Sequence, residues 1–271
     1  MHSNNITLIT FLFFSFLIYA QNDKLQQVKQ NLAKKQDMQV YITDVKQKQD
    51  QKTHSNPFKE LLAQIFWNIT YGIAVETIFE KESKMHDASI SKYSYIEDKT
   101  GNFTYNDSLS VISRLLITDS FLRESNSIKG NNLNLKHQFF KRFAVEFGYL
   151  ELIEKTNRRK DHFSLFSFMA NYYRIRTKRL DAWYGIGAMY VANDINKFGL
   201  AFGAGAEWFV KKPISLYASI KSGIINQESL TKSKIQLKYY QKRAQFIIGY
   251  QNFKLTTISV NSVSLGFGYQ L

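Results

Sequence analysis

Apolar and polar residues alternate with a period of two along most of the second half of the chain. Between residues 197 and 210, one parity carries large apolar residues such as Phe198, Leu200 and Trp208, and the other carries mainly glycine, alanine and charge. Successive side chains of a β-strand point to opposite faces, so this pattern predicts a strand with one large apolar face. Similar alternation begins near Trp67 and continues to Leu271.

Short basic turns interrupt the alternation at regular intervals. Roughly 30 to 40 residues separate one from the next, which fits two strands and a loop and is typical of successive antiparallel hairpins. The turns are Lys141-Arg142, Lys178-Arg179, Lys211-Lys212-Pro213 and Lys242-Arg243.

Eleven segments are candidate strands. Eight follow Arg142, and the other three are Ile69–Phe79, Leu109–Phe121 and Leu133–Phe140. Transmembrane barrels of bacteria have even strand numbers, so we expect an antiparallel up-and-down barrel of about ten strands, with eight or twelve as alternatives.

The second face of several strands is built from small residues. In a water-soluble β-sandwich this face meets water and carries Thr, Lys, Glu and Ser, whereas a narrow closed barrel needs small side chains in its crowded lumen. The small residues are Gly185, Gly187, Gly203, Gly205, Gly266 and Gly268. They favour a closed barrel, and a soluble exported β-sandwich that binds ligands is the alternative.

Aromatic residues lie near many of the predicted strand ends. A transmembrane barrel places aromatic girdles at both interfaces of its apolar band, so their position favours a membrane-spanning barrel. These residues are Trp67, Phe140, Phe143, Trp183, Trp208, Tyr239, Tyr240 and Tyr269.

The chain ends on an alternating apolar strand, "NSVSLGFGYQL". This ending resembles the terminal strand of bacterial outer-membrane β-barrel proteins, which their insertion machinery recognises. The final residue of that family is usually aromatic, whereas here it is Leu271, preceded by Tyr269. The resemblance covers residues 67–271. It implies an outer-membrane location, insertion through the C-terminal strand, and a periplasmic position for that strand's end and for the four basic turns.

The region before the barrel divides into three segments. Residues 1–20 contain an apolar run after "MHSNN" that ends in Ala20 before a polar stretch, which predicts a secretory signal peptide, with an uncleaved membrane anchor as the alternative. Residues 21–56 are rich in Gln and Lys and form a polar periplasmic segment, either helical or disordered. Residues 57–66 begin at Pro57 and predict a short amphipathic helix.

Within the polar segment, Leu25, Val28 and Leu32 share one face of a possible helix.

Composition limits the possible partners and cofactors. Lys and Arg exceed Asp and Glu by 14, there is no cysteine, and no nucleic-acid-binding motif is recognisable. An exported basic chain meets anionic membrane surfaces, so we expect outer-membrane lipid as a partner, an envelope protein as a further possible partner, and no nucleic acid. The histidines show no metal-ligand spacing, which predicts neither a metal site nor a cofactor.

One stretch, "DHFSLF", carries residue types used in catalysis. His162 and Ser164 share a strand face, so a general base and a nucleophile are conceivable there, and they are the candidate catalytic pair. The additional motif residues of barrel enzymes are missing, so we expect no enzyme.

Charged residues inside the predicted strands are expected to point mostly into the lumen, because charge on the lipid face is costly. They are Glu146, Glu151, Glu154, Arg174, Arg176, Glu207 and Lys221.

These patterns predict an outer-membrane, porin-like β-barrel with a structural, adhesive or assembly role. In this hypothesis the segment Ser83–Asp107 forms a polar loop that is presented to partners. The alternatives are a narrow channel or small-ligand transporter, and a lipid-modifying enzyme at the barrel rim.

Overall fold

The structure is a computed structural model that describes residues 24–33, 88–96, 101–124, 127–156, 160–226, 228–255 and 258–271. The predicted signal peptide 1–20, the predicted helix 57–66 and the candidate strand Ile69–Phe79 lie outside these residues. Within the described residues, no helix has both the length and the apolar character needed to cross a membrane.

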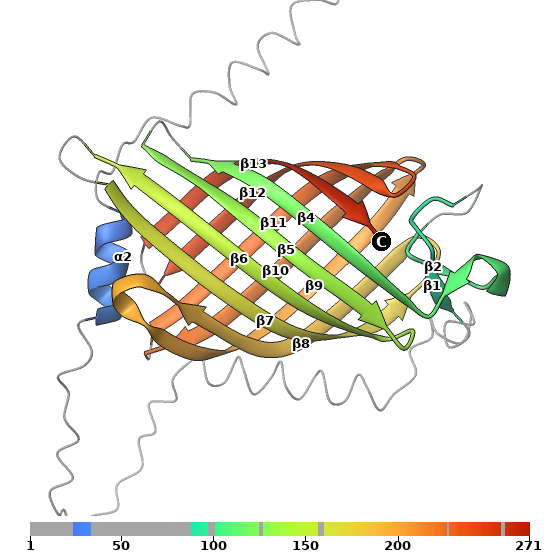
Figure 1. The fold of residues 1–271 in the computed structure, drawn as a ribbon, viewed down its shortest axis with the longest axis horizontal. Coiled ribbons are helices and arrows are strands. Elements are labelled where there is room, and N and C mark those ends of the chain that lie inside the picture. Colours follow the sequence, from blue (N-terminus) through green and yellow to red (C-terminus); the bar gives the residue numbers. More distant parts are fainter. Residues whose placement is uncertain are drawn as a thin grey trace, which may run out of the picture.

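Ten antiparallel strands form one closed barrel (Figure 1), which confirms the expected fold and strand number. The first strand of the ring, β4, pairs with the last, β13, and thereby closes the sheet. The strands are β4 (Ser113–Arg123), β5 (Ile128–Phe139), β6 (Phe143–Lys155), β7 (Lys160–Arg176), β8 (Leu180–Val191), β9 (Lys197–Lys211), β10 (Ile214–Ile225), β11 (Glu228–Gln241), β12 (Ala244–Leu255) and β13 (Ile258–Gln270).

The outer wall of the barrel is apolar. In β9, Phe198, Leu200 and Trp208 are exposed on the outside, while Gly199 and Glu207 face inward, as the alternation predicted. Further exposed apolar residues cover the other strands, among them Phe121, Phe147, Phe168, Ile186, Ile220, Ile235, Leu237, Phe246, Ile248, Val263, Leu265 and Phe267. Soluble monomers rarely expose such continuous apolar surface, so closure and an apolar wall together exclude the soluble sandwich and identify a transmembrane-type barrel.

The four basic turns lie at the same end of the barrel as the C-terminus. They connect β5–β6, β7–β8, β9–β10 and β11–β12, and the C-terminal residue lies beside the start of β4. The backbone amides and carbonyls of Leu115 and Leu271 exchange two hydrogen bonds of 2.8 and 3.1 Å. This end is called the C-terminal end below, and the other is called the distal end.

Not all of the predicted girdle aromatics face the lipid. Phe140, Phe143, Trp208, Tyr239 and Tyr269 are exposed, as expected for a girdle. Trp183 and Tyr240 are instead buried inside the lumen, because each has the inward parity of its strand. Trp67 lies outside the described residues.

The absence of a side chain at Gly205 leaves room for the Trp183 ring in the lumen. A Cβ atom at Gly205 would lie 2.8 Å from the indole ring, well inside van der Waals contact. We expect Gly205→Val to lower the free energy of unfolding by about 1–3 kcal/mol, because the ring must move within a packed lumen. Chemical unfolding in detergent micelles, followed by tryptophan fluorescence, measures the loss. The matched control is Ala204→Val on the exposed outer face, and an equal loss in both variants would contradict this explanation.

Candidate functional site

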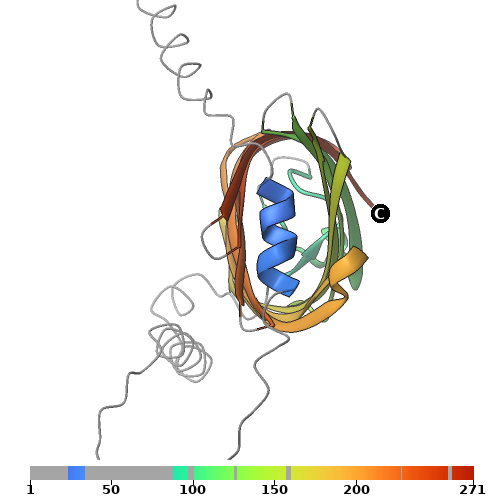
Figure 2. The same cartoon turned by 90° about the vertical axis from the view of Figure 1, so that its left-hand side faces the viewer.

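A helix closes the distal end of the barrel. Helix α2 (Lys24–Ala33) lies within the ring of strands when the barrel is viewed along its axis (Figure 2). Leu25, Val28 and Leu32 share one face of this helix, and all three side chains are fully buried. They pack against an apolar lining made of inward residues from many strands, including Leu122, Leu150, Leu152, Leu165, Met189, Val191, Phe253, Leu255 and Val260.

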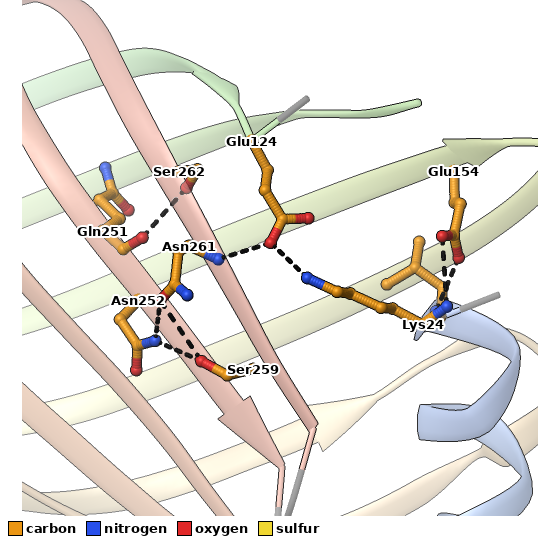
Figure 3. Close-up of polar contacts among 9 residues, drawn as sticks. Lys24, Glu124, Glu154, Gln251, Asn252, Ser259, Asn261 and Ser262 are labelled. Carbon is orange, nitrogen blue, oxygen red and sulfur yellow. Dashed lines mark hydrogen bonds and ion pairs between the residues drawn. The ribbon is translucent and has the colours of Figure 1, made fainter. Parts of the chain in front are cut away.

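Polar contacts fix the first turn of α2 to the barrel (Figure 3). The backbone amides of Lys24 and Leu25 donate to the Glu154 carboxylate at 3.2 and 2.8 Å. The Lys24 ammonium lies 2.7 Å from the Glu124 carboxylate, which also accepts from the backbone amide of Asn261 at 3.0 Å. The amides of the first helical turn have no partners within the helix, so a carboxylate there satisfies them and complements the helix dipole.

The opposite end of the helix is also attached. The Asn226 side chain, in the connection between β10 and β11, donates to the carbonyl of Leu32 at 2.7 Å. The helix therefore binds at both of its ends and along its apolar face. It lies at the distal end, whereas we expected residues 21–56 on the side of the four basic turns. The physical reason is that apolar lining lies at the distal end, where the helix can bury its apolar face.

A second segment fills the C-terminal end. Strands β1 (Ser89–Ser91), β2 (Phe103–Thr104) and β3 (Ser110–Val111) form a small antiparallel sheet, and the 3-10 helix η3 (Asp107–Leu109) lies between β2 and β3. Figure 1 shows β1 and β2 at the end opposite α2. We call the described residues 88–96 and 101–111 the plug.

Hydrogen bonds from the barrel wall hold the plug in place. Arg176, which is fully buried, donates to the carbonyl of Ala88 at 2.6 Å and lies over the Phe103 ring. The Asn102 amide donates to the Asp181 carboxylate at 2.7 Å. Arg114 donates to the carbonyl of Ser91 at 3.2 Å.

Tyr95 anchors the plug to the turn between β9 and β10. Its hydroxyl donates to the carbonyl of Ile214, and its ring packs edge-on against Phe209 and Tyr240. Burial raises the pKa of this hydroxyl, and the nearby Glu207 carboxylate raises it further. Tyr95 therefore remains a neutral hydrogen-bond donor at physiological pH.

For the described residues 88–96 and 101–107, these contacts correct the expectation that Ser83–Asp107 forms a presented loop. Ile90, Phe103 and Ser94 are buried, because Ile90 and Phe103 pack against inward residues of the barrel and Ser94 bonds to Asn102 and Gln270. The sequence showed a polar stretch but gave no signal for its burial, since the partners of its polar groups come from distant strands.

A charged layer extends inside the lumen from the middle of the strands toward the C-terminal end. The Glu146 carboxylate accepts from Lys221 at 2.6 Å, from Asn171 at 3.0 Å and from Asn134. The Glu207 carboxylate, on β9, accepts from Lys238 at 3.1 Å, from Ser215 at 2.6 Å and from the Tyr240 hydroxyl.

Lysines outnumber these two carboxylates in the charged layer. Lys136 donates to the Tyr173 hydroxyl at 3.2 Å, and Lys232 donates to the Asn132 side chain at 2.6 Å. Lys234 shares the inward parity of β11 and lies over the Tyr217 ring. The layer therefore contains more lysines than carboxylates, and their amino groups are held by neutral oxygens and aromatic rings as well as by acids.

The strand charges mostly face the lumen, as expected. Glu146, Glu154, Arg176, Glu207 and Lys221 are buried there.

Three further charged positions differ from this rule. Glu151 has the outward parity of β6, and Arg174 lies at a bulge of β7 between Tyr173 and Ile175. Asp119 is exposed on the outer wall opposite Phe267 of β13, a lipid-facing acid that sequence reasoning did not single out.

The candidate catalytic pair lies on the outer wall near the distal end. His162 and Ser164 share the outward parity of β7, as predicted, and the His162 ring contacts the Glu151 carboxylate at 3.4 Å. Ser164 is buried, and its hydroxyl accepts from Asn193 at 3.2 Å. Among the described residues, no hydrogen bond joins the His162 ring to Ser164, so the base is not placed to activate this hydroxyl.

No metal-ligand cluster occurs in the described part of the chain, where His, Asp and Glu side chains do not gather in groups of three or more.

Comparisons with known proteins give likeness of fold alone. No protein-family model and no curated protein matches the chain. The NanC porin structure is 9% identical over 58% of this chain and 100% of that chain, with a TM-score of 0.39. The KdgM porin in complex with disordered oligogalacturonate is 9% identical over 58% and 98%, with a TM-score of 0.35. The Yersinia pestis outer membrane protein Ail in a phospholipid bilayer nanodisc is 16% identical over 59% and 98%, with a TM-score of 0.33.

Proposed function

We propose that the protein is a structural β-barrel of the bacterial outer membrane whose lumen is closed to solutes. The observation that carries this proposal is that the chain occupies both ends of its own barrel, with α2 at the distal end and the plug at the C-terminal end. A barrel of this size has an interior largely filled by side chains, and these two segments add to that filling.

Short connections between strands at the distal end favour a structural role over an adhesive one. Only residues 226–227 connect β10 to β11, and only residues 256–257 connect β12 to β13. Connections this short present little surface to a partner. The protein is exported through the signal peptide 1–20 and inserted through β13, whose apolar outer face runs through Val263, Leu265 and Phe267 to its end.

Fractionation and gel mobility test the location. We expect the protein in the detergent-extracted outer-membrane fraction, with faster migration before heating than after it, because a closed hydrogen-bond ladder resists dodecyl sulfate until it is heated. A periplasmic protein without this mobility shift would contradict the proposal.

A gated anion channel is the second candidate function, and the excess of lysine in the charged layer favours it. Under this alternative, release of both α2 and the plug opens a path lined by Lys136, Lys221 and Lys234. A variant without residues 24–33 and 88–111 would then conduct in planar bilayers with selectivity for chloride over potassium. A silent variant would favour the structural role.

A further inference from the structure

A groove lies on the outer wall near the distal end of β4–β7. It has a volume of about 340 Å³, and its lining includes Phe121, Lys129, Glu151, Ile153, Lys155 and Lys160. We call these six residues the rim groove. Phe121 and Ile153 supply apolar surface, and the lysines are exposed around it.

Like charges face each other across the strands of this groove. Lys155 of β6 pairs directly with Lys160 of β7, and Lys129 of β5 pairs directly with Arg123 of β4. Cations directly opposite each other on one face of a sheet repel and destabilise the pairing. An anion placed between them would remove this repulsion.

The groove itself contains little negative charge to balance these cations. Glu151 is the acid in its lining, and its carboxylate contacts the His162 ring. For the described residues, no ion pair joins Lys129, Lys155 or Lys160 to an acid. Elsewhere at the distal end Lys254 of β12 is also exposed, but it faces Ser259 of β13 across the sheet. Directly opposed lysines are therefore a feature of the groove.

Apolar wall lies directly below the groove. On β6, the outward positions that precede Glu151 are Tyr149 and Phe147, and the Phe166 ring packs against both. A ligand that fits here has an anionic head at the level of the lysines and hydrocarbon chains along the aromatic wall. A membrane lipid has this distribution of charge, whereas an acidic peptide has no part that matches the wall.

We propose that the rim groove binds a phosphorylated membrane lipid, with the phosphate held by Lys129, Lys155 and Lys160 and the acyl chains against Phe121 and Phe147. Lysine ammonium groups bind phosphate as point charges, and basic residues at a membrane surface attract anionic lipid. This inference rests on the proposed membrane location and deepens it by naming a lipid class and a site.

Native mass spectrometry of the full-length protein in a neutral detergent tests the site. The probes are diphosphoryl lipid A and the same lipid with both phosphates removed. We expect the phosphorylated probe to be retained preferentially, and the triple variant K129Q/K155Q/K160Q to bind it about 10- to 100-fold more weakly. The control variant K211Q/K242Q/K254Q removes equal charge from exposed positions outside the groove and should bind as the unaltered protein does.

Three results would overturn the inference. They are equal retention of both probes, unchanged binding by the triple variant, and displacement of the lipid by inorganic phosphate or by an acidic peptide at comparable concentration. The heat-dependent gel shift of each variant separates the two proposals. If the unaltered protein shows the heat-dependent gel shift but does not discriminate between the two probes, only the lipid site is contradicted. If it shows no gel shift, the membrane location is contradicted as well.

Discussion

Replacement of Glu207 by leucine is expected to lower the free energy of unfolding by about 3–5 kcal/mol, because it leaves a buried ammonium group without its counter-charge. Glu207 is 2% exposed and accepts from Lys238, Ser215 and the Tyr240 hydroxyl. Unfolding by urea in lipid vesicles, followed by tryptophan fluorescence, measures the loss.

Two further variants separate the loss of charge balance from the loss of packing. Glu207→Gln keeps an acceptor for Ser215 and Tyr240 but removes the charge, so it should fall between the unaltered protein and the leucine variant. The double variant Glu207→Leu/Lys238→Met removes both charges and should recover most of the loss. A double variant as unstable as the single one would show that the ion pair is not the cause.

Replacement of Val28 by aspartate is expected to release α2 from the barrel. Val28 is fully buried against the apolar lining, and burying a valine side chain stabilises by about 1.5–3 kcal/mol. Loss of this burial free energy increases the fraction of molecules with α2 released from the barrel roughly 10- to 150-fold. The cost of burying the aspartate carboxylate increases that fraction further. Trypsin cleavage after Lys24 and Lys29 reports the released helix, since cleavage follows the open population.

Gln27→Asp is the matched control for Val28→Asp, because it adds the same charge to the exposed face of the same helix. Its cleavage rate should remain close to that of the unaltered protein. Equal cleavage of both variants would mean that the apolar face of α2 does not hold the helix in place.

The barrel itself was predictable because its pattern is repeated and local. Alternation in Phe198–Val210 shows which side of a strand meets lipid, and the basic turns mark the ends of hairpins. Closure through β4 and β13 was not predictable in this way, because no residue of either strand encodes its partner and Ile69–Phe79 was an equally plausible first strand.

The two internal segments were not predictable in the same way. The face formed by Leu25, Val28 and Leu32 was visible in the sequence, but its partners come from inward positions of strands far along the chain. The plug is polar, and its burial depends on donors such as Arg176 and Arg114 that look like ordinary lumen charges. The sequence pattern shows which face of a segment is apolar. The binding of α2 and the plug inside the barrel depends on contacts that form only in the folded barrel.

Single-channel recording of the full-length protein in planar bilayers shows whether its lumen is closed to ions. We expect no discrete conductance steps, because α2 and the plug occupy the two ends of the barrel. Insertion is verified in the same membranes by resistance of the barrel to protease. Regular open-channel steps from the unaltered protein, unchanged by Val28→Asp, would contradict the claim that the lumen is closed by its own chain.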